Sequence, residues 1–257
     1  MRVIGHRGTP TGPRSSENTL PALRAALEAG ADGFEIDVRA TRDGVLVLCH
    51  DPDLGRVLGT GAGTGPVVAR STAAALRALR LPHGARVPIL GEALDLAAAH
   101  RACVVTEVKR ETGPDRLRTA RLLAALLRER RRRRPGADRV ITSSFDPLVA
   151  VALAGHGTAG GAVILEPHVE PGPPARRARG QGLTELHLGV QHVRRDPSVV
   201  ARLHALGLRV AAGIVDDPEE ARALARLGVD LLCTDAPDRV VHREVVHREP
   251  VAAAAAS

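Results

Sequence analysis

Residues 33–38 read Gly33-Phe-Glu-Ile-Asp-Val38, and apolar and acidic side chains alternate strictly along this stretch. A period of two is typical of a β-strand, so Glu35 and Asp37 are predicted to project from one face and the apolar residues from the other. Two carboxylates on one strand face lie about 7 Å apart. They repel each other unless positive charge lies nearby, and a hard divalent cation would supply it. An exposed strand with an acidic solvent face fits these six residues equally well, so the rest of the chain has to decide.

The length and the order of strand and helix patterns predict one large domain. The chain has 257 residues, 44% of them hydrophobic, with no Trp, no Tyr and two Phe, so we expect an aliphatic core. Strand patterns alternate with helical ones, which favours a parallel sheet with crossover helices. Eight parallel strands are predicted, at residues 2–4, 33–38, 103–109, 139–143, 161–165, 185–189, 208–214 and 229–233. This number favours a closed (β/α)8 TIM barrel over an open doubly wound sheet.

Two segments depart from this alternation. A turn signal followed by a strand at 45–50 predicts a hairpin after the second strand. Residues 51 to about 88 come next; they are rich in Gly and Pro and contain one clear helical pattern, around 71–81. We expect them to form a small insertion without a core of its own, and its glycines suggest a mobile lid. Residues 241–257 carry a tandem repeat and an Ala run, so we predict a low-complexity C-terminal tail after a single barrel domain at 1–240.

The charge balance is basic, with 36 Lys and Arg against 29 Asp and Glu and a net charge of +7. Nucleic-acid binding is one interpretation of such a balance, but the aromatic residues that stack on single strands are almost absent. The densest basic run, 130–134, ends a helical pattern, where cations complement the helix dipole. No nucleic-acid partner is therefore expected. Lys109 is the one lysine among these cations, which is either chance or the mark of a position that needs a compact point charge.

The cysteines and the first residues of the chain bear on the cellular compartment in which the protein is expected. Cys49, Cys103 and Cys233 are far apart in the sequence and each lies in an apolar run, which is typical of reduced core residues. The first residues lack the apolar region of a signal peptide, and no apolar run approaches membrane-spanning length. We expect a cytoplasmic protein without a transmembrane segment. The sequence also lacks a G-x-G-x-x-G motif after a strand and a P-loop, which argues against nucleotide binding.

Polar side chains cluster at the predicted carboxyl ends of the strands, where barrel enzymes have their catalytic groups. The cluster consists of two histidines (His6 and His50), two cations (Arg7 and Lys109), three carboxylates (Glu35, Asp37 and Glu107) and two further acids (Asp51 and Asp235). The three carboxylates form an oxygen-rich group suited to Mg²⁺ or Ca²⁺. The two cations, together with such an ion, would bind a phosphate group, and the two histidines can accept and donate protons near neutral pH. This combination indicates metal-assisted hydrolysis of a phosphoester.

Several short motifs follow one another along nearly the whole chain. They are Gly5-His-Arg-Gly8, Glu17-Asn-Thr19, the run from Gly30 to Val38, Thr41-Arg-Asp-Gly44, His50-Asp51, Thr106-Glu-Val-Lys109, Ser144-Phe145 and the run from Gly228 to Pro237. Together they resemble the glycerophosphodiester phosphodiesterase family. The resemblance implies a (β/α)8 barrel with a small insertion after the second strand. It also implies hydrolysis of glycerophosphodiesters to glycerol 3-phosphate and an alcohol, with Mg²⁺ or Ca²⁺ as cofactor.

The resemblance assigns roles to seven of the clustered residues. It implies that Glu35, Asp37 and Glu107 are metal ligands. It makes His6 and His50 the acid/base pair, and Arg7 and Lys109 the cations that bind the phosphate. Within the acid/base pair, our hypothesis is that His6 assists the attacking oxygen and His50 protonates the leaving alcohol.

The chain departs from the family at Gly213, where a Trp is usual at the end of the seventh strand, so the fit of the glycerol part of a substrate is altered. Two other hypotheses stay open. A lysophospholipase D-like or other phosphodiesterase would keep the chemistry and change the substrate, and an apolar groove beside the site would favour it. A non-catalytic barrel that binds phosphorylated ligands is consistent with the lost Trp, but it would not need both histidines, all three carboxylates and the lysine.

Overall fold

The computed structural model describes residues 1–10, 16–111 and 116–241, and the structural statements below concern these residues. Eight parallel strands follow one another around a closed barrel in the order β1-β9-β8-β7-β6-β5-β4-β2, and β2 pairs with β1 to close it. The predicted (β/α)8 TIM barrel is therefore confirmed. The strands are β1 (Arg2–Gly5), β2 (Gly33–Ala40), β3 (Leu46–Leu48), β4 (Cys103–Val108), β5 (Arg139–Ser144), β6 (Gly160–Ile164), β7 (Glu185–Gly189), β8 (Arg209–Gly213) and β9 (Leu231–Thr234).

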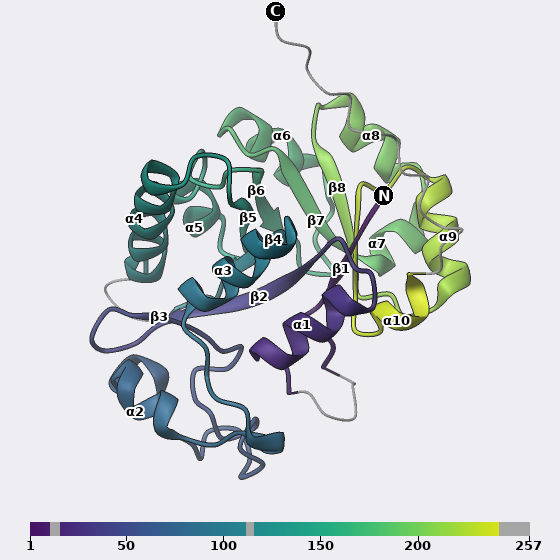
Figure 1. Cartoon of the computed structure of the whole chain (residues 1–257). Coiled ribbons are helices and arrows are strands. Elements are labelled where there is room, and N and C mark those ends of the chain that lie inside the picture. Colours follow the sequence, from purple (N-terminus) through teal and green to yellow (C-terminus); the bar gives the residue numbers. More distant parts are fainter. Residues whose placement is uncertain (11–15, 112–115, 242–257) are drawn as a thin grey trace, which may run out of the picture.

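Helices surround the barrel (Figure 1). They are α1 (Leu20–Glu28), α2 (Ala73–Ala78), α3 (Leu90–His100), α4 (Arg118–Arg133), α5 (Pro147–Ala152), α6 (Gly172–Gly180), α7 (Val190–Arg195), α8 (Val199–Ala205), α9 (Pro218–Arg226) and α10 (Pro237–Val240), with 3₁₀ turns η1 (Val68–Arg70) and η2 (Pro82–Gly84). Side-chain caps begin several of them, as at α1, where the Thr19 hydroxyl accepts a hydrogen bond from the Ala22 N–H. Helix α7 was not expected; it begins directly after β7, with Gly189 as its N-cap.

The register between strands places the predicted site residues side by side. Asp37 on β2 lies opposite Glu107 on β4, and Glu107 lies opposite Ser143 on β5. The alternation along 33–38 sends the acidic side chains into the barrel and the apolar ones outward, where Phe34 packs between the sheet and its helices. Aliphatic residues and one cysteine from six strands fill the barrel interior: Ile4, Cys103, Val105, Ile141, Ala162, Ala211 and Leu231. The core is aliphatic, as the composition predicted.

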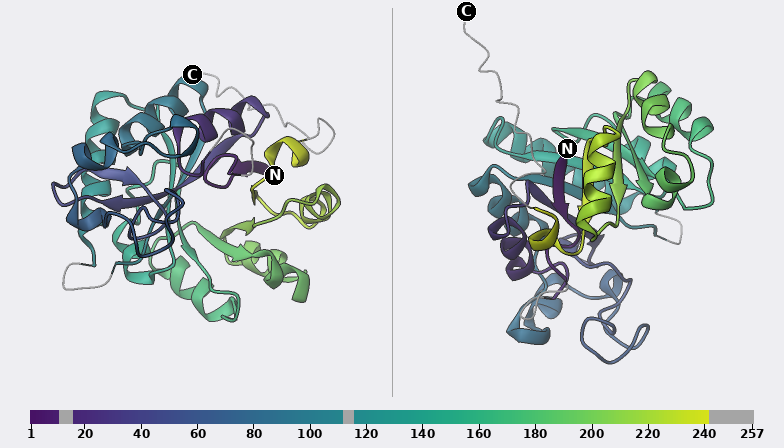
Figure 2. Two further views of the ribbon diagram at one scale, coloured as in Figure 1. Left: turned by 90° about the horizontal axis from the view of Figure 1, so that it is seen from below. Right: turned by 90° about the vertical axis from the view of Figure 1, so that its right-hand side faces the viewer.

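The predicted hairpin is present, because β3 pairs antiparallel with β2, although this strand spans only Leu46–Leu48. The segment that follows, with α2, extends from one end of the barrel (Figures 1 and 2). We predicted that this insertion is not a domain with a core of its own; it does contribute most members of one cluster of buried side chains. This cluster holds the insertion together with the hairpin: Val47, Cys49, Leu54, Val68, Ala73, Leu76, Leu81 and Val87. Ala73 and Leu76 have helical spacing and Val47 and Cys49 strand spacing, but no pattern in the sequence links these local signals into one cluster.

Three further predictions concern the ends of elements and the tail. Helix α4 ends at Arg133, so the basic run lies at a helix terminus, where Arg130 contacts both Asp95 and Asp138. Among the residues that the structure describes, no helix is long and apolar enough to cross a membrane. The predicted tail at 241–257 lies outside the described residues except for its first residue.

Candidate active site

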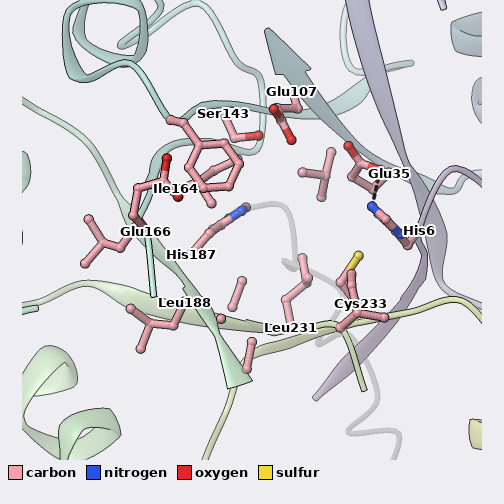
Figure 3. A pocket seen from close by; sticks show the side chains of 18 of the residues that line it. His6, Glu35, Glu107, Ser143, Ile164, Glu166, His187, Leu188, Leu231 and Cys233 are labelled. Carbon is pink, nitrogen blue, oxygen red and sulfur yellow. Dashed lines mark ion pairs between the residues drawn. The ribbon is translucent and has the colours of Figure 1, made fainter. Parts of the chain in front are cut away.

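A cavity of about 380 Å³ lies at the carboxyl ends of the strands. Figure 3 shows His6, Glu35 and Glu107 on one side of it, and mostly aliphatic residues such as Ile164, Leu188 and Leu231 on the other, where Glu166 and His187 are the polar side chains. All seven residues assigned roles from the sequence lie at or next to this cavity: six line it, and the seventh, Asp37, is buried behind Lys109. A cavity at this end of a TIM barrel is where such enzymes bind their substrates.

Three carboxylates meet beneath the side of the cavity that His6 lines. Oxygen atoms of Glu35, Asp37 and Glu107 all lie within 4.8 Å of one another, and all three residues are buried. Burial and, after it, the neighbouring Asp37 charge raise the pKa of Glu35 to about 8. Burial and Asp37 also raise the pKa of Glu107, against the opposing effect of Lys109. Ionising all three carboxylates together is therefore unfavourable unless further positive charge is present.

Asp37 is the carboxylate that its neighbours keep ionised. Burial raises its pKa, but Lys109 and Arg7 together hold that pKa below the ordinary value. The Lys109 Nζ lies 3.3 Å from Oδ1, and the Arg7 Nε lies 3.0 Å from Oδ2. Asn18 completes the arrangement, because its amide N–H donates to Oδ2 at 2.8 Å and its carbonyl accepts from the Asp37 N–H at 3.0 Å. Asn18 adopts a positive φ of 56°, a conformation that Asn tolerates better than most residues.

Each histidine is oriented by a carboxylate. The Nδ1 of His6 lies 2.7 Å from Asp235, and its Nε2 lies 3.9 Å from Glu35. Likewise, the Nδ1 of His50 lies 2.7 Å from Asp51. Because an ionised carboxylate only accepts hydrogen bonds, Nδ1 carries the proton in both neutral rings and Nε2 is the acceptor. Both rings thus present a basic nitrogen toward the cavity.

A salt-bridge network connects the insertion to this site. Arg56, from the insertion, contacts Asp51 at 2.5 Å and Glu17 at 2.6 Å. Glu17 in turn contacts Arg7 at 3.1 Å. Through these contacts Arg56 supports both the carboxylate that orients His50 and the one that holds Arg7. The sequence suggested neither the role of Arg56 nor that of Asn18, since both depend on contacts between residues far apart in the chain.

The carboxylates fit a divalent cation. Oε1 of Glu35 is buried and has no hydrogen-bond partner among the described residues, which is costly for an oxygen acceptor. Three carboxylates from adjacent strands, with no thiolate among them, form the oxygen donor set that Mg²⁺ and Ca²⁺ prefer. The geometry therefore supports cation binding, and the donor set does not choose between the two metals.

Three residues of the cavity wall differ from the sequence-based expectation or were missed by it. Cys233, expected in the core, is partly exposed and lines the cavity. Gly213 also lines it, and a Cβ there would lie 2.8 Å from the Cys233 Cβ, so a larger side chain would have to move this wall. His187 was overlooked: it projects from β7 into the cavity (Figure 3), and only its place in an inward-facing alternation, with Glu185 before it, could have indicated this.

A model of the glycerophosphoryl diester phosphodiesterase family matches residues 6–239 of the chain. The chain belongs to this family. A glycerophosphodiester phosphodiesterase from Caldanaerobacter subterraneus subsp. tengcongensis is 27% identical over 93% of this chain and 96% of the relative. Among solved structures, a glycerophosphodiester phosphodiesterase from Parabacteroides distasonis has a TM-score of 0.76 at 24% identity, covering 93% of this chain and 94% of that one.

A further solved structure has a bound reaction product. The Oleispira antarctica phosphodiesterase, in complex with sn-glycerol-3-phosphate, has a TM-score of 0.76 at 22% identity and covers 95% of this chain and 96% of that one. At such identities the two structures establish the fold, and the family model establishes the kind of enzyme. The glycerophosphoryl diester phosphodiesterase family consists of phosphoric diester hydrolases, so the predicted family and enzyme class are confirmed.

Proposed function

We propose that this enzyme hydrolyses glycerophosphodiesters to glycerol 3-phosphate and an alcohol, with a divalent cation at Glu35, Asp37 and Glu107. The observation that carries the proposal is the juxtaposition of this carboxylate cluster with two oriented histidines at one cavity. The product named for the Oleispira antarctica structure, which has the same fold, is the one expected here. Either Mg²⁺ or Ca²⁺ suits the ligands, and a small-molecule diester is the expected partner.

The residues of the site divide the chemistry between them. The bound cation would polarise a phosphoryl oxygen and neutralise charge that builds up during the reaction. Arg7 and Lys109, both held near Asp37, offer cationic groups to the phosphate from the same side of the cavity. Their contacts with the buried carboxylates fix their positions before substrate arrives, and such pre-organised charge stabilises a transition state more than mobile charge does.

The two histidines move the protons. With Nδ1 bonded to Asp235, the Nε2 of His6 is free to accept the proton of the attacking oxygen, beside Glu35. We assign His50 as the acid that protonates the leaving alcohol, because Asp51 accepts a hydrogen bond from Nδ1 and leaves Nε2 as the nitrogen that can deliver a proton. This division of roles is part of the proposal.

A specific observation favours a second candidate, a lysophospholipase D-like activity at the same site. A mainly apolar hollow of about 280 Å³ between β6 and α6, which Arg110 and Arg177 also line, shares Phe145, Ile164, Leu165 and Glu166 with the main cavity. An acyl chain on the substrate could occupy this hollow while the phosphate lies at the carboxylates. The ratio of choline release from lysophosphatidylcholine and from glycerophosphocholine separates the two candidates.

The proposed activity is tested by release of glycerol 3-phosphate from glycerophosphocholine and glycerophosphoethanolamine. Protein treated with EDTA and dialysed should be inactive, and either Mg²⁺ or Ca²⁺ should restore turnover. A variant with His6→Ala, assayed under the same conditions, should lose at least about 10²-fold of the activity. Failure to hydrolyse either diester with any of these metals would contradict the proposal, and so would full activity in EDTA.

A further inference from the structure

His187 is a buried, oriented histidine that the proposed chemistry does not use. It lies on β7, across the cavity from His6, and its ring extends into the cavity (Figure 3). Only 8% of the residue is exposed. At the same level of the barrel, the neighbouring strands present Ile164 and Ala211, which both line the cavity. His187 therefore places a polar ring between two aliphatic neighbours in the cavity wall.

A buried carboxylate, Glu185, determines which nitrogen of the His187 ring carries the proton. The His187 Nε2 lies 3.2 Å from Oε2 of Glu185, which is 2% exposed and also contacts the Arg209 guanidinium. Burial raises the pKa of Glu185, but His187 and Arg209 together hold it below its ordinary value. An ionised carboxylate can only accept, so Nε2 carries the proton and Nδ1 of the neutral ring is a hydrogen-bond acceptor.

The acceptor nitrogen has no partner in the protein. Among the residues that the structure describes, none forms a hydrogen bond with Nδ1 of His187. Nor does it belong to the described side-chain atoms that are fully buried without a partner, so it is reached from the cavity that His187 lines. A nitrogen held at a cavity wall by a buried Glu–Arg pair is thus prepared for a donor that arrives with a ligand.

We propose that His187 is a substrate-binding residue whose Nδ1 accepts a hydrogen bond from a free hydroxyl of the substrate's glycerol arm. The inference rests on the proposed function, because glycerol is the part that all glycerophosphodiesters share. The aliphatic neighbours of His187 would pack against the carbon chain of that arm, and the acceptor would select for its hydroxyl. A hydroxyl on the leaving alcohol offers the same chemistry, so the test has to separate the two sources.

The test compares glycerophosphocholine with propyl phosphocholine, which lacks the glycerol hydroxyls, by following choline release. Choline has no free hydroxyl once it is esterified, so any difference between the two diesters comes from the glycerol arm. The wild-type kcat/KM should fall by about tenfold or more on propyl phosphocholine. His187→Phe, which keeps the ring and removes the nitrogens, should lose about as much on glycerophosphocholine and little on propyl phosphocholine, so that discrimination disappears.

Two further variants separate binding from structural support. His187→Asn keeps an acceptor near the position of Nδ1 and should retain part of the discrimination. His204→Leu is the matched control, because His204 also pairs with a carboxylate, Asp230 at 2.8 Å, but lies on α8 away from the cavity. It should leave both rates unchanged. Thermal melting of each variant shows whether it is folded. If His187→Phe does not fold, His187→Asn carries the test, and lack of discrimination by the wild type still overturns the inference.

The outcomes are distinguishable. No choline release by wild-type enzyme with Mg²⁺ or Ca²⁺ would contradict the proposed function itself. Release without discrimination by the wild type, or an equal loss on both substrates in folded His187→Phe, would overturn the inference while the function stands. A preference that depends on His187 only when the leaving alcohol carries hydroxyls, as in glycerophosphoglycerol, would also overturn the assignment to the glycerol arm.

Discussion

Asp37 is fully buried, and its ionised state depends on neighbours that replace water. Two of them, Arg7 and Lys109, supply charge, while Asn18 supplies two hydrogen bonds that fix the orientation of the carboxylate. Groups that orient a metal ligand in this way contribute to affinity although they do not contact the metal. At the scale of single residues, the site is therefore larger than its three predicted ligands.

We predict that Asn18→Gly weakens binding of Mg²⁺ or Ca²⁺ by about 10- to 100-fold, because Asp37 loses both hydrogen bonds from the amide. Glycine is chosen because it accepts the positive φ of 56° at this position, so that the backbone is preserved. Calorimetric titration of EDTA-treated protein measures the affinity. An unchanged affinity in a folded variant would mean that Asn18 only supports the loop.

The division of roles between the histidines gives a second prediction at this scale. His50→Ala should lower kcat by about 10²- to 10⁴-fold on glycerophosphocholine, whose alcohol needs a proton to leave. On a p-nitrophenyl diester, whose leaving group needs little protonation, the loss should be much smaller. Steady-state rates of wild type and variant on both substrates measure it. Equal losses on the two would show that His50 is not the acid.

Strand β2 carries two of the three carboxylates, and its first residue lies very close to β4. A Cβ at Gly33 would lie 1.9 Å from the Cys103 carbonyl oxygen, so a side chain there forces the two strands apart. Gly33→Ala should destabilise the protein by roughly 1–3 kcal/mol and weaken metal binding at the proposed site between these strands. Denaturant unfolding measures the first effect.

Gly91→Ala is the control for Gly33→Ala. A Cβ at Gly91, in α3, would have no atom within 4 Å, so this substitution should be neutral or stabilising by up to about 1 kcal/mol. If both variants are equally stable, the close approach of β2 and β4 is not needed for the fold.

Most elements could be predicted because their signals are local. The alternation at 33–38 gives a strand and its inward face, and the repeated pair at Glu107 and Lys109 gives the facing strand. The remaining parts of the site depend on contacts that no local pattern encodes. Asn18 reaches Asp37 across 19 positions, and Arg56 reaches Glu17 across 39. The buried cluster of the insertion escaped prediction for the same reason, since its members come together only after the Gly-rich loops have folded.

At the scale of the whole molecule, the insertion is connected to the catalytic end of the barrel by Arg56, which contacts both Asp51 and Glu17. We predict that Arg56→Ala lowers kcat/KM by about tenfold, because His50 and Arg7 each lose support for an orienting carboxylate. Its melting temperature should change little, since the Arg56 side chain is 42% exposed and an ion pair to an exposed arginine adds little stability. Glycerol 3-phosphate release and thermal melting measure the two effects.

Arg77→Ala is the matched control for Arg56→Ala. Arg77 is also an insertion arginine paired with a carboxylate, Glu92 at 2.6 Å, but it lies on α2 away from the cavity. Its removal should leave kcat/KM unchanged. Equal effects of the two substitutions on activity would mean that the insertion acts through its general stability and not through Arg56. That residues 1–240 form one domain, insertion included, stays a prediction, and a single unfolding transition would support it.

The central claim is that Glu35, Asp37 and Glu107 bind one divalent cation that hydrolysis requires. The most direct measurement adds Mg²⁺ or Ca²⁺ to EDTA-treated protein and follows heat of binding and glycerol 3-phosphate release in parallel, for wild type and Glu107→Gln. We predict one binding site per chain, activity that returns over the same range of metal concentration, and loss of both in the variant. Unchanged metal affinity in Glu107→Gln, or full wild-type activity without metal, would contradict the account.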